Sequence, residues 1–579
     1  MENSAGKIND RDTGAEMMTS TIKQPAYRIL FSLLHRSRWI LFIAILASIV
    51  NGISNVFLIT LVNRIVTTSG NSYHLLAVYF CIIAVLAIVS HVMSGVIFAR
   101  LSQNTIARMR EFISERITRA PFRQIEILGA SRAQSIITDD TTNVSLLFFT
   151  LPNIVTQSSI ILGCLIYLAW LSWSVFFLVL TVIVIGSLGY AIGGTSALAS
   201  LKAAGKSQDR LFNHFNALFT GAKELKLHFS RAQAFFTHSL GREIGAVRQH
   251  RIRAFSVYAF GAGWMYLLFY IFLGLVIFAP AVIAGLKVTT IAGYVIVFLF
   301  ILMPLDSLLN SIPSLNAARV SLNRIGYVLS ELTEQDHLDE QVSASEFGEA
   351  NLLQLSGITH NYYREKEDDM FQLGPIDMTL KRGEITFLIG GNGSGKTTLA
   401  KLLSGLYTPE NGTITVDGNL ITDSNRANYR QLFSAIFSDF HLFETLIGLT
   451  DTDSVLDARA NALLAKLHLE HKVKIQDGCF STRELSQGQR KRLALVVAYL
   501  EDRPFYLFDE WAADQDPLFK IVFYQELLPE LAARGKAVLA ITHDDRFFHL
   551  ADRCIKLENG QLTGQKSDIH NGVTEHQSL

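Results

Sequence analysis

Long apolar stretches dominate the first half of the chain. Six of them reach the roughly 20 residues that a helix needs to cross the hydrocarbon core of a bilayer. They cover about residues 39–62, 75–98, 147–170, 174–197, 256–280 and 288–310. One such run also fits a buried helix of a soluble protein, but six in succession favour membrane spans. The pattern therefore predicts an α-helical transmembrane domain of six helices in residues 26–330, preceded by a polar tail in residues 1–25.

Two long polar segments, about residues 100–146 and 199–255, follow the second and the fourth span. Apolar residues recur in the second segment at the spacing of one helical face, within residues 211–219. We expect the spans to continue through these segments as long helices. A turn is expected at Gly129, whereas Gly221 fits either a turn or a helix interior.

Lysine and arginine are unevenly distributed among the loops. The polar tail and both long polar segments are rich in them, whereas the remaining loops hold only Arg64 and Lys287. Basic loops stay on the cytoplasmic side of a membrane. The distribution therefore predicts a multi-pass protein with both termini and both long segments in the cytoplasm.

Composition supports a membrane protein. Charged residues make up 18% of the chain and mean hydropathy is +0.28, whereas soluble proteins carry about 25% charged residues. The net charge of +0 gives no basic field, so nucleic acid is not an expected partner. The cysteines show no spacing typical of a metal site, and we interpret them as small buried hydrophobic residues. They are Cys81, Cys164, Cys479 and Cys554.

Polar residues interrupt the predicted spans. They are Asn51, Asn55, His91, Asn153, Gln157, Asp306 and Asn310. They fit either a cargo pathway or hydrogen bonds between helices. Asp306 is the costliest of them to bury, and it follows Pro304, which can kink a helix. A position near the cytoplasmic end of the span is an alternative for Asp306. Three aromatic residues of the fifth span, Tyr258, Trp264 and Tyr266, fit either stacking surfaces for cargo or ordinary packing and interfacial anchoring.

The second half of the chain has another pattern. Residues 331–350 are acidic and read as a solvated linker. Residues 351–579 alternate short apolar β-rich runs with helical stretches, which is typical of an α/β domain.

A glycine-rich motif follows the apolar run Ile385–Ile389. It matches the phosphate-binding pattern GxxxxGK[ST], with a strand predicted before it and a helix after it. Its residues are Gly390, Gly391, Asn392, Gly393, Ser394, Gly395, Lys396, Thr397 and Thr398. Backbone N–H groups of such a loop wrap the phosphates at a helix N-terminus. Lys396 is expected to reach the β- and γ-phosphates and Thr397 to offer its hydroxyl to Mg²⁺, so ATP and Mg²⁺ are the expected cofactors.

Two adjacent carboxylates end a second buried strand. The apolar residues 505–508 precede Asp509 and Glu510. We expect Asp509 to hold Mg²⁺ and Glu510 to act as the general base that activates the attacking water. Such a strand end alone is weak evidence for ATP hydrolysis. Downstream of a phosphate-binding loop it is strong evidence.

The segment Leu485-Ser486-Gln487-Gly488-Gln489 resembles the LSGGQ signature of the ATP-binding cassette family, with Gln487 replacing a glycine. The resemblance covers the whole chain, six spans followed by one cassette. It implies an α/β P-loop NTPase fused to an exporter-type membrane domain. It also implies that Ser486, Gln487, Gly488 and Gln489 close over the ATP of a second copy, with Ser486 and Gly488 at its γ-phosphate. A homodimer is the simplest assembly.

The same resemblance assigns further residues. His543 is similar to the family's switch histidine at the γ-phosphate. Asp516 is similar to an aspartate that crosses the dimer interface. Tyr362 falls where the family stacks an aromatic ring on adenine, although the neighbouring Tyr363 is an alternative. A metal-binding glutamine of the family falls at Ser438 here, and Ser438 or the adjacent Asp439 is expected to replace it.

Four stretches resemble a narrower group. They are Phe508–Pro517, with Trp511 directly after the expected catalytic glutamate, Ile541–Asp545, Gly390–Gly395 and Lys223–Leu227. A Thr-x-Val-Gly-Glu type segment, common in multidrug exporters, is absent from the sequence. Together these features look like bacterial cyclic-peptide and siderophore-peptide exporters of the pyoverdine and syringomycin type.

The resulting hypothesis is a half-transporter of the bacterial inner membrane that dimerises and uses ATP to export a peptide-like compound. An importer, or a lipid or drug exporter, on the same scaffold is an alternative. A regulatory ATPase that gates a partner without moving cargo is another. The presence of both Glu510 and His543 favours catalytic ATP hydrolysis, and this argues against the regulatory alternative.

Overall fold

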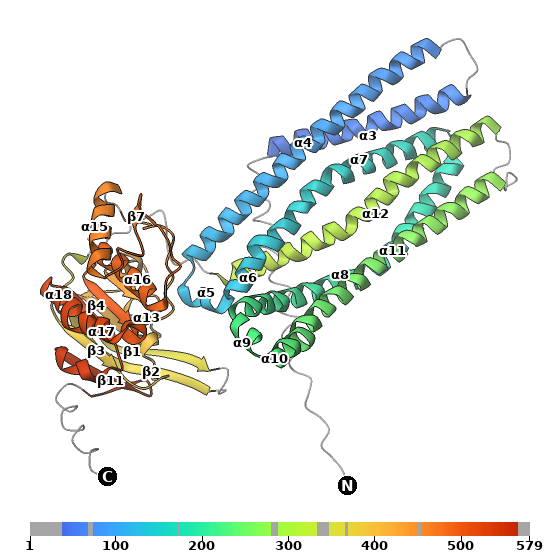
Figure 1. Cartoon of the computed structure of the whole chain (residues 1–579). Helices are drawn as coiled ribbons and strands as arrows, with labels where there is room; N and C mark the ends of the chain where they lie inside the picture. Colours follow the sequence, from blue (N-terminus) through green and yellow to red (C-terminus); the bar gives the residue numbers. More distant parts are fainter. Residues whose placement is uncertain are drawn as a thin grey trace, which may run out of the picture. The chain divides into compact units, whose positions relative to one another are not determined.

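The computed structural model describes most of the chain in two compact units (Figure 1). One unit comprises Met1–Ala120 and Gln124–Thr333, and the other Pro121–Arg123 and Glu334–Leu579. The described residues are 38–67, 73–171, 173–278, 288–332, 347–364, 369–449 and 453–564. The predicted polar tail and most of the predicted acidic linker lie outside them.

Six long helices build the first unit, as the apolar runs predict. By length and composition, each can cross a membrane. They are α3 (Arg38–Thr67), α4 (Tyr73–Arg119), α7 (Thr141–Leu171), α8 (Trp173–Thr220), α11 (Gly241–Phe278) and α12 (Val288–Glu331). Helices α4 and α8 have 47 and 48 residues, so they run far beyond the predicted spans. This confirms that the spans continue into the polar segments.

Short helical pieces connect the long helices of the unit. Between α4 and α7 lie α5 (Phe122–Leu128), α6 (Ala130–Ser135) and the π-helical η1 (Ile136–Asp140); between α8 and α11 lie α9 (Ala222–Leu227), α10 (Phe229–Ala234) and the π-helical η2 (Phe235–Leu240). Gly129 separates α5 from α6 with φ 74°, which confirms the expected turn. Gly221 interrupts the helix between α8 and α9, so of the two alternatives for this position the turn is confirmed.

Helices of this unit pair along their lengths, α3 with α4, α7 with α12 and α8 with α11. Figure 1 shows α8 and α11 running side by side. Phe269 of α11 stacks on Phe298 of α12 with ring centroids 3.8 Å apart. The Tyr190 hydroxyl of α8 donates to the Leu309 carbonyl of α12 at 3.0 Å. Tyr258 is buried and accepts a hydrogen bond from Asn316, so it serves packing rather than a stacking surface.

Several polar residues of the spans bond across helices. Asn51 Nδ2 of α3 lies 3.2 Å from His91 Nδ1 of α4. Asn153 Nδ2 of α7 donates to Ser307 Oγ of α12 at 2.7 Å. The cysteine interpretation is right for Cys164 and Cys554, which are buried, and wrong for Cys81 and Cys479, which are exposed. Cys81 lies in a membrane helix, where an exposed small apolar side chain faces lipid without penalty.

The second unit is an α/β domain, as its sequence pattern predicts. A six-stranded sheet has the order β12-β11-β3-β10-β9-β6, and a four-stranded antiparallel sheet has the order β2-β1-β4-β5. The strands are β1 (Leu352–Arg364), β2 (Asp369–Lys381), β3 (Ile385–Ile389), β4 (Asn411–Val416), β5 (Asn419–Leu420), β6 (Phe433–Ile436), β9 (Phe505–Asp509), β10 (Ala537–Ile541), β11 (Arg553–Glu558) and β12 (Gln561–Gly564). A small pair, β7 (Ile475–Gln476) and β8 (Cys479–Phe480), lies apart from both. The helices are α13 (Lys396–Leu403), α14 (Arg426–Arg430), α15 (Asp453–Lys466), α16 (Gln487–Glu501), α17 (Pro517–Val522) and α18 (Leu528–Ala533).

The central strands β3, β9 and β10 run parallel and are buried at every residue. Such strands read as continuous apolar runs because both faces of the sheet are covered. Their carboxyl ends lie at one edge of the sheet, where α/β proteins bind their ligands. This arrangement brings the glycine-rich loop, the two carboxylates and His543 to the same edge.

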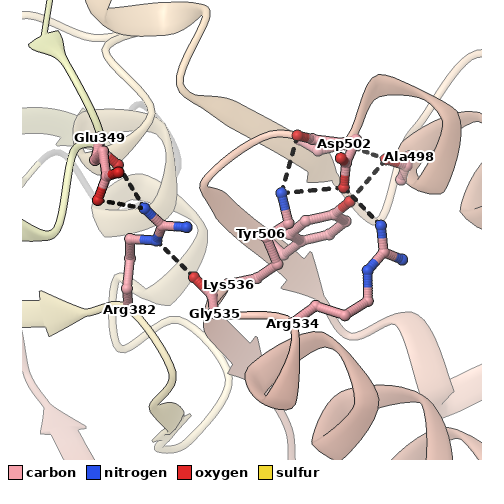
Figure 2. Close-up of polar contacts among 9 residues, drawn as sticks. Glu349, Arg382, Ala498, Asp502, Tyr506, Arg534, Gly535 and Lys536 are labelled. Carbon is pink, nitrogen blue, oxygen red and sulfur yellow. Dashed lines mark hydrogen bonds and ion pairs between the residues drawn. The ribbon is translucent and has the colours of Figure 1, made fainter.

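A polar cluster fixes the opposite ends of these strands (Figure 2). Asp502, which ends α16 with φ 49°, accepts hydrogen bonds from Arg534 at 2.8 Å and pairs with Lys536 at 3.0 Å. Arg382, before β3, donates to the Gly535 carbonyl at 2.6 Å and the Glu349 carbonyl at 3.0 Å. The cluster joins the turns that lead into β3, β9 and β10.

We expect Asp502→Ala to lower the stability of this unit without affecting hydrolysis. The ion pairs are partly exposed, so their loss costs about 1 kcal/mol. Thermal melting should show a lower midpoint, and the kcat for ATP should stay within about twofold, because the cluster lies at the far end of the strands. Asp502→Asn isolates the loss of the charge, because asparagine tolerates the left-handed backbone conformation that alanine disfavours. A large fall in kcat would contradict a purely structural role.

Candidate ATP-binding and hydrolysis site

The glycine-rich loop turns sharply between β3 and α13. Gly390 has φ 153°, and a Cβ there would lie 2.1 Å from the Leu557 carbonyl oxygen. Gly395 has φ 103° and directly precedes α13. Residues with side chains rarely adopt these conformations, and at Gly390 no space exists for one. The backbone therefore folds closely around the N-terminus of α13, which is a favourable place for an anion.

Lys396 lies inside this loop. Its Nζ donates to the Gly390 and Gly391 carbonyls, both at 2.9 Å, and the residue is only 6% exposed. Burial lowers the pKa of Lys396, and the nearby carboxylates of Glu510 and Asp509 oppose that shift. The Ser394 hydroxyl is buried and has no hydrogen-bond partner in the described part of the chain. A buried ammonium group and a buried unpaired hydroxyl in one loop fit a bound phosphate.

A cavity of about 280 Å³ opens at the loop. It is lined by Phe371, Asn392, Gly393, Gly395, Lys396, Thr397, Thr398 and Glu510. Phe371 was not predicted from the sequence. The predicted adenine-stacking residue Tyr362 pairs with Phe371 across β1 and β2, but its side chain lies outside those the structure describes. An aromatic ring at this cavity is suited to a nucleotide base.

The predicted metal residues Thr397 and Asp509 lie together. Thr397 Oγ1 donates to Asp509 Oδ2 at 3.0 Å, and the Ser438 N–H also donates to Asp509. Burial raises the pKa of Asp509, and these hydrogen bonds oppose the shift. Asp439 is exposed, and it is the backbone of its neighbour Ser438 that reaches the site.

This pair suits Mg²⁺. The described residues contain no group of three or more His, Cys, Asp or Glu side chains that could hold a metal. Mg²⁺ keeps several waters and binds through one or two carboxylates together with substrate phosphates, so it needs no larger group. Thr397 and Asp509 would hold it, and when bound it neutralises charge on the phosphates.

We expect Thr397→Val to raise the Mg²⁺ concentration needed for half-maximal ATP hydrolysis by about tenfold. The change removes the hydroxyl that fixes Asp509 and would contact the metal, which is worth roughly one charge-assisted hydrogen bond. Thr397→Ser keeps the hydroxyl and is the matched control. The measurement is steady-state hydrolysis across a Mg²⁺ titration. An unchanged Mg²⁺ requirement in Thr397→Val would show that the hydroxyl is not a ligand.

Glu510 and His543 face each other at the strand ends. His543 Nε2 lies 3.2 Å from Glu510 Oε1, and both side chains are partly exposed. Glu510 has φ 51°, in the left-handed region where non-glycine residues are uncommon, and its N–H donates to the Ile541 carbonyl. This backbone position directs the carboxylate to the cavity, where it can take a proton from an attacking water.

A buried lysine holds the backbone of Glu510, and the sequence analysis did not single it out. Lys491 of α16 has a side chain that is 3% exposed. Its Nζ donates to the Glu510 carbonyl at 2.8 Å and pairs with Asp514 at 2.7 Å. The buried Trp511 donates in turn to the Lys491 carbonyl at 2.9 Å. These contacts tie α16 to the segment that carries the Glu510 carboxylate.

The signature residues lie at the start of α16. Ser486 Oγ accepts from the Gln489 N–H at 3.3 Å, and Gln489 Oε1 accepts from the Ser486 N–H, which together form a capping box. Gln487 donates to Asp514 at 3.0 Å, and the Gly488 carbonyl accepts from Gln515 at 3.0 Å. Ser486 and Gln487 are exposed, and none of the four is among the residues that line the 280 Å³ cavity.

The site defines a class of protein. A phosphate-binding loop, a carboxylate pair and a histidine end three neighbouring parallel strands, which is the arrangement of a P-loop ATPase. The same chain carries six helices able to cross a membrane. The chain is therefore a membrane ATPase.

Comparisons with known proteins agree on the family. Residues 373–513 match the family model for the ABC transporter and residues 39–305 that for the ABC transporter transmembrane region. The ATP-binding protein SyrD of Pseudomonas syringae pv. syringae is 35% identical over 534 residues, covering 90% of this chain and 93% of the relative. The chain belongs to the ABC transporter family and is an ATP hydrolase coupled to transmembrane transport.

Two further relatives have lower identity to this chain. An ATP-dependent lipid A-core flippase of Ralstonia nicotianae is 26% identical over 80% of this chain and 79% of its own length. A probable syringafactin export ATP-binding/permease protein, SyfD, of Pseudomonas syringae pv. syringae is 29% identical over 37% of this chain and 34% of its own length. A bacterial Atm1-family ABC exporter with ATP bound has a TM-score of 0.73 at 16% identity and covers 92% of this chain and 95% of that chain. It shows the exporter fold.

Proposed function

We propose that two copies of this chain form an exporter of the bacterial inner membrane, with the cassettes in the cytoplasm. The proposal rests on one observation: the signature residues 486–489 do not line the cavity that the phosphate-binding loop forms. The loop, Asp509, Glu510 and His543 share one edge of the sheet, whereas the exposed Ser486 does not line their cavity. A second copy can therefore supply its signature helix to each ATP.

Hydrolysis in this assembly uses the residues of both chains. Lys396 and the loop bind the phosphates, and Tyr362 or Phe371 stacks on the base. The capped N-terminus of α16, with Ser486 through Gln489, closes over the γ-phosphate of the other copy. Glu510 accepts the proton of the attacking water, and His543 hydrogen-bonds the γ-phosphate and Glu510. Closing and opening of the cassettes shifts the membrane helices between inward- and outward-facing states.

The proposed cargo is a peptide-like amphipathic compound, either a cyclic peptide or a siderophore-related one. Support comes from the similarity to SyrD along nearly the whole chain and from SyfD, whose name assigns syringafactin export. Two cavities of about 600 and 540 Å³ in the membrane unit carry both polar and apolar lining and suit an amphipathic molecule.

Transport into inverted membrane vesicles tests the proposal. The test cargo is the peptide fraction retained by cells that lack the protein, compared by mass spectrometry with the fraction that normal cells secrete. ATP-dependent accumulation in inverted vesicles, absent with Glu510→Gln, supports export. Accumulation only in right-side-out vesicles means import, and flipping of lipid in cargo-free liposomes favours the function named for the flippase relative. ATP hydrolysis without any flux favours a regulatory ATPase.

A further inference from the structure

A carboxylate within the sixth apolar run lines the cavity of about 540 Å³ between α7, α11 and α12. Asp306 of α12 accepts a hydrogen bond from Asn310 Nδ2 at 3.1 Å. The Tyr266 hydroxyl of α11 also hydrogen-bonds to Asp306. Both groups are donors without charge, so they orient the carboxylate and leave its negative charge uncompensated.

No Lys, Arg or His is among the described residues that line this cavity. A carboxylate in a membrane helix is costly, and such groups usually pair with a cation or mark the path of a substrate. Apart from Asp306, the described lining consists of hydroxyl, amide and apolar side chains. A cationic group on a molecule that enters the cavity would give Asp306 an ion-pair partner.

The other side chains that line the cavity indicate which kind of molecule would fit it. Leu302 and Met303 provide an apolar wall, and Met303 is 80% exposed and adaptable in shape. Asn153 and Gln157 line this cavity and also the larger one of about 600 Å³ between α3, α4 and α7. Gln157 Nε2 donates to Asn153 Oδ1 at 3.1 Å. Side-chain amides of this kind match the amide groups of a peptide.

We propose that Asp306, with Tyr266 and Asn310, is a cation subsite for the cargo. The cargo then carries an ammonium or guanidinium group within a peptide-like, partly apolar molecule. The cationic group pairs with Asp306, and the amide groups of the cargo contact Asn153 and Gln157. Its apolar part packs on Leu302 and Met303. This inference rests on the proposed export function and narrows the class of cargo.

A matched pair of small lipopeptides tests whether a positive charge on the cargo strengthens binding. The first probe is N-dodecanoyl-Gly-Ser-Lys-amide, and the second has acetyl-lysine in place of lysine, which removes the charge and adds a small acetyl group. Binding of the tritiated probes is measured to the full chain in phosphatidylcholine nanodiscs, with empty nanodiscs subtracted. We expect the lysine probe to bind about tenfold more tightly, as one partly shielded ion pair predicts.

Substitutions locate the effect at Asp306. Asp306→Asn should reduce the tenfold preference to nearly one, with the affinity for the acetyl-lysine probe retained, which also shows that the variant is folded. Asp306→Glu should keep the preference. Asp139→Asn, a charge change in the same unit and outside both cavities, is the control. A preference that survives in Asp306→Asn, or equal or absent binding of both probes to the unaltered chain, overturns the proposal.

ATP-driven accumulation of the probes in proteoliposomes separates this inference from the proposed function. Equal accumulation of both probes leaves export standing and removes the cation subsite. A charge preference in binding without any ATP-driven accumulation keeps the subsite and removes export.

Discussion

Glu510→Gln is expected to lower steady-state ATP hydrolysis by at least about a hundredfold while ATP still binds. A positioned general base contributes roughly 10²- to 10⁴-fold to a proton transfer, and glutamine cannot accept the proton. The Glu510 carboxylate lines the cavity at the phosphate-binding loop and lies 3.2 Å from His543 Nε2. Glutamine has the same shape, so the cavity and the loop stay intact. The measurements are kcat in nanodiscs and the affinity for a fluorescent ATP analogue.

Glu526→Gln is the matched control for this variant. Glu526 lies in the π-helical segment η6 (Phe523–Leu527), is exposed, and does not line the cavity. Its substitution should leave kcat within about twofold. Normal steady-state hydrolysis in Glu510→Gln would reject Glu510 as the base. A loss of ATP binding together with hydrolysis would instead assign Glu510 to nucleotide binding.

Lys491→Met is expected to lower kcat by roughly 10- to 100-fold with little change in the KM for ATP. Lys491 donates to the Glu510 carbonyl and pairs with Asp514, and hydrogen bonds of a charged group are worth about 1.5–3 kcal/mol each. Methionine fills a similar volume without a donor. The carbonyl then loses its partner, and the backbone that holds Glu510 in the left-handed conformation is no longer fixed. This result would make Lys491 a positioning residue, which acts through Glu510.

Two further variants distinguish positioning from general damage. Lys472→Met replaces an exposed lysine and should have no effect. Adding Asp514→Asn to Lys491→Met removes the unpaired charge, so the double variant should be less impaired than the sum of the single effects. A raised KM with normal kcat would contradict the positioning role, and so would a normal kcat in Lys491→Met.

Features that depend on short stretches of chain were predictable. The membrane helices follow from the length of each apolar run. The phosphate-binding loop follows from the spacing of its glycines, since Gly390 and Gly395 need conformations that glycine adopts most easily. The buried strand before Asp509 and Glu510 follows from its apolar residues.

Features that depend on packing between distant segments were not predictable. Lys491 stands between Arg490 and Arg492, and this run of charge reads as a solvated helix face. Only the packing of α16 against the segment after β9 buries Lys491 and leaves Arg490 exposed. Phe371 reaches the nucleotide cavity because β2 pairs with β1, a register that no local pattern shows.

The class of this protein, six membrane helices joined to an ATP-hydrolysing cassette, follows from local patterns along the chain. Apolar run length and glycine spacing are local properties, and local sterics and the hydrophobic effect act on them directly. The sharing of one cavity by distant side chains, such as Asp306 of α12 and Tyr266 of α11, becomes visible in the folded chain alone. The physical reason is that partners far apart in the chain meet through helix and strand packing, which depends on the shapes of many side chains at once.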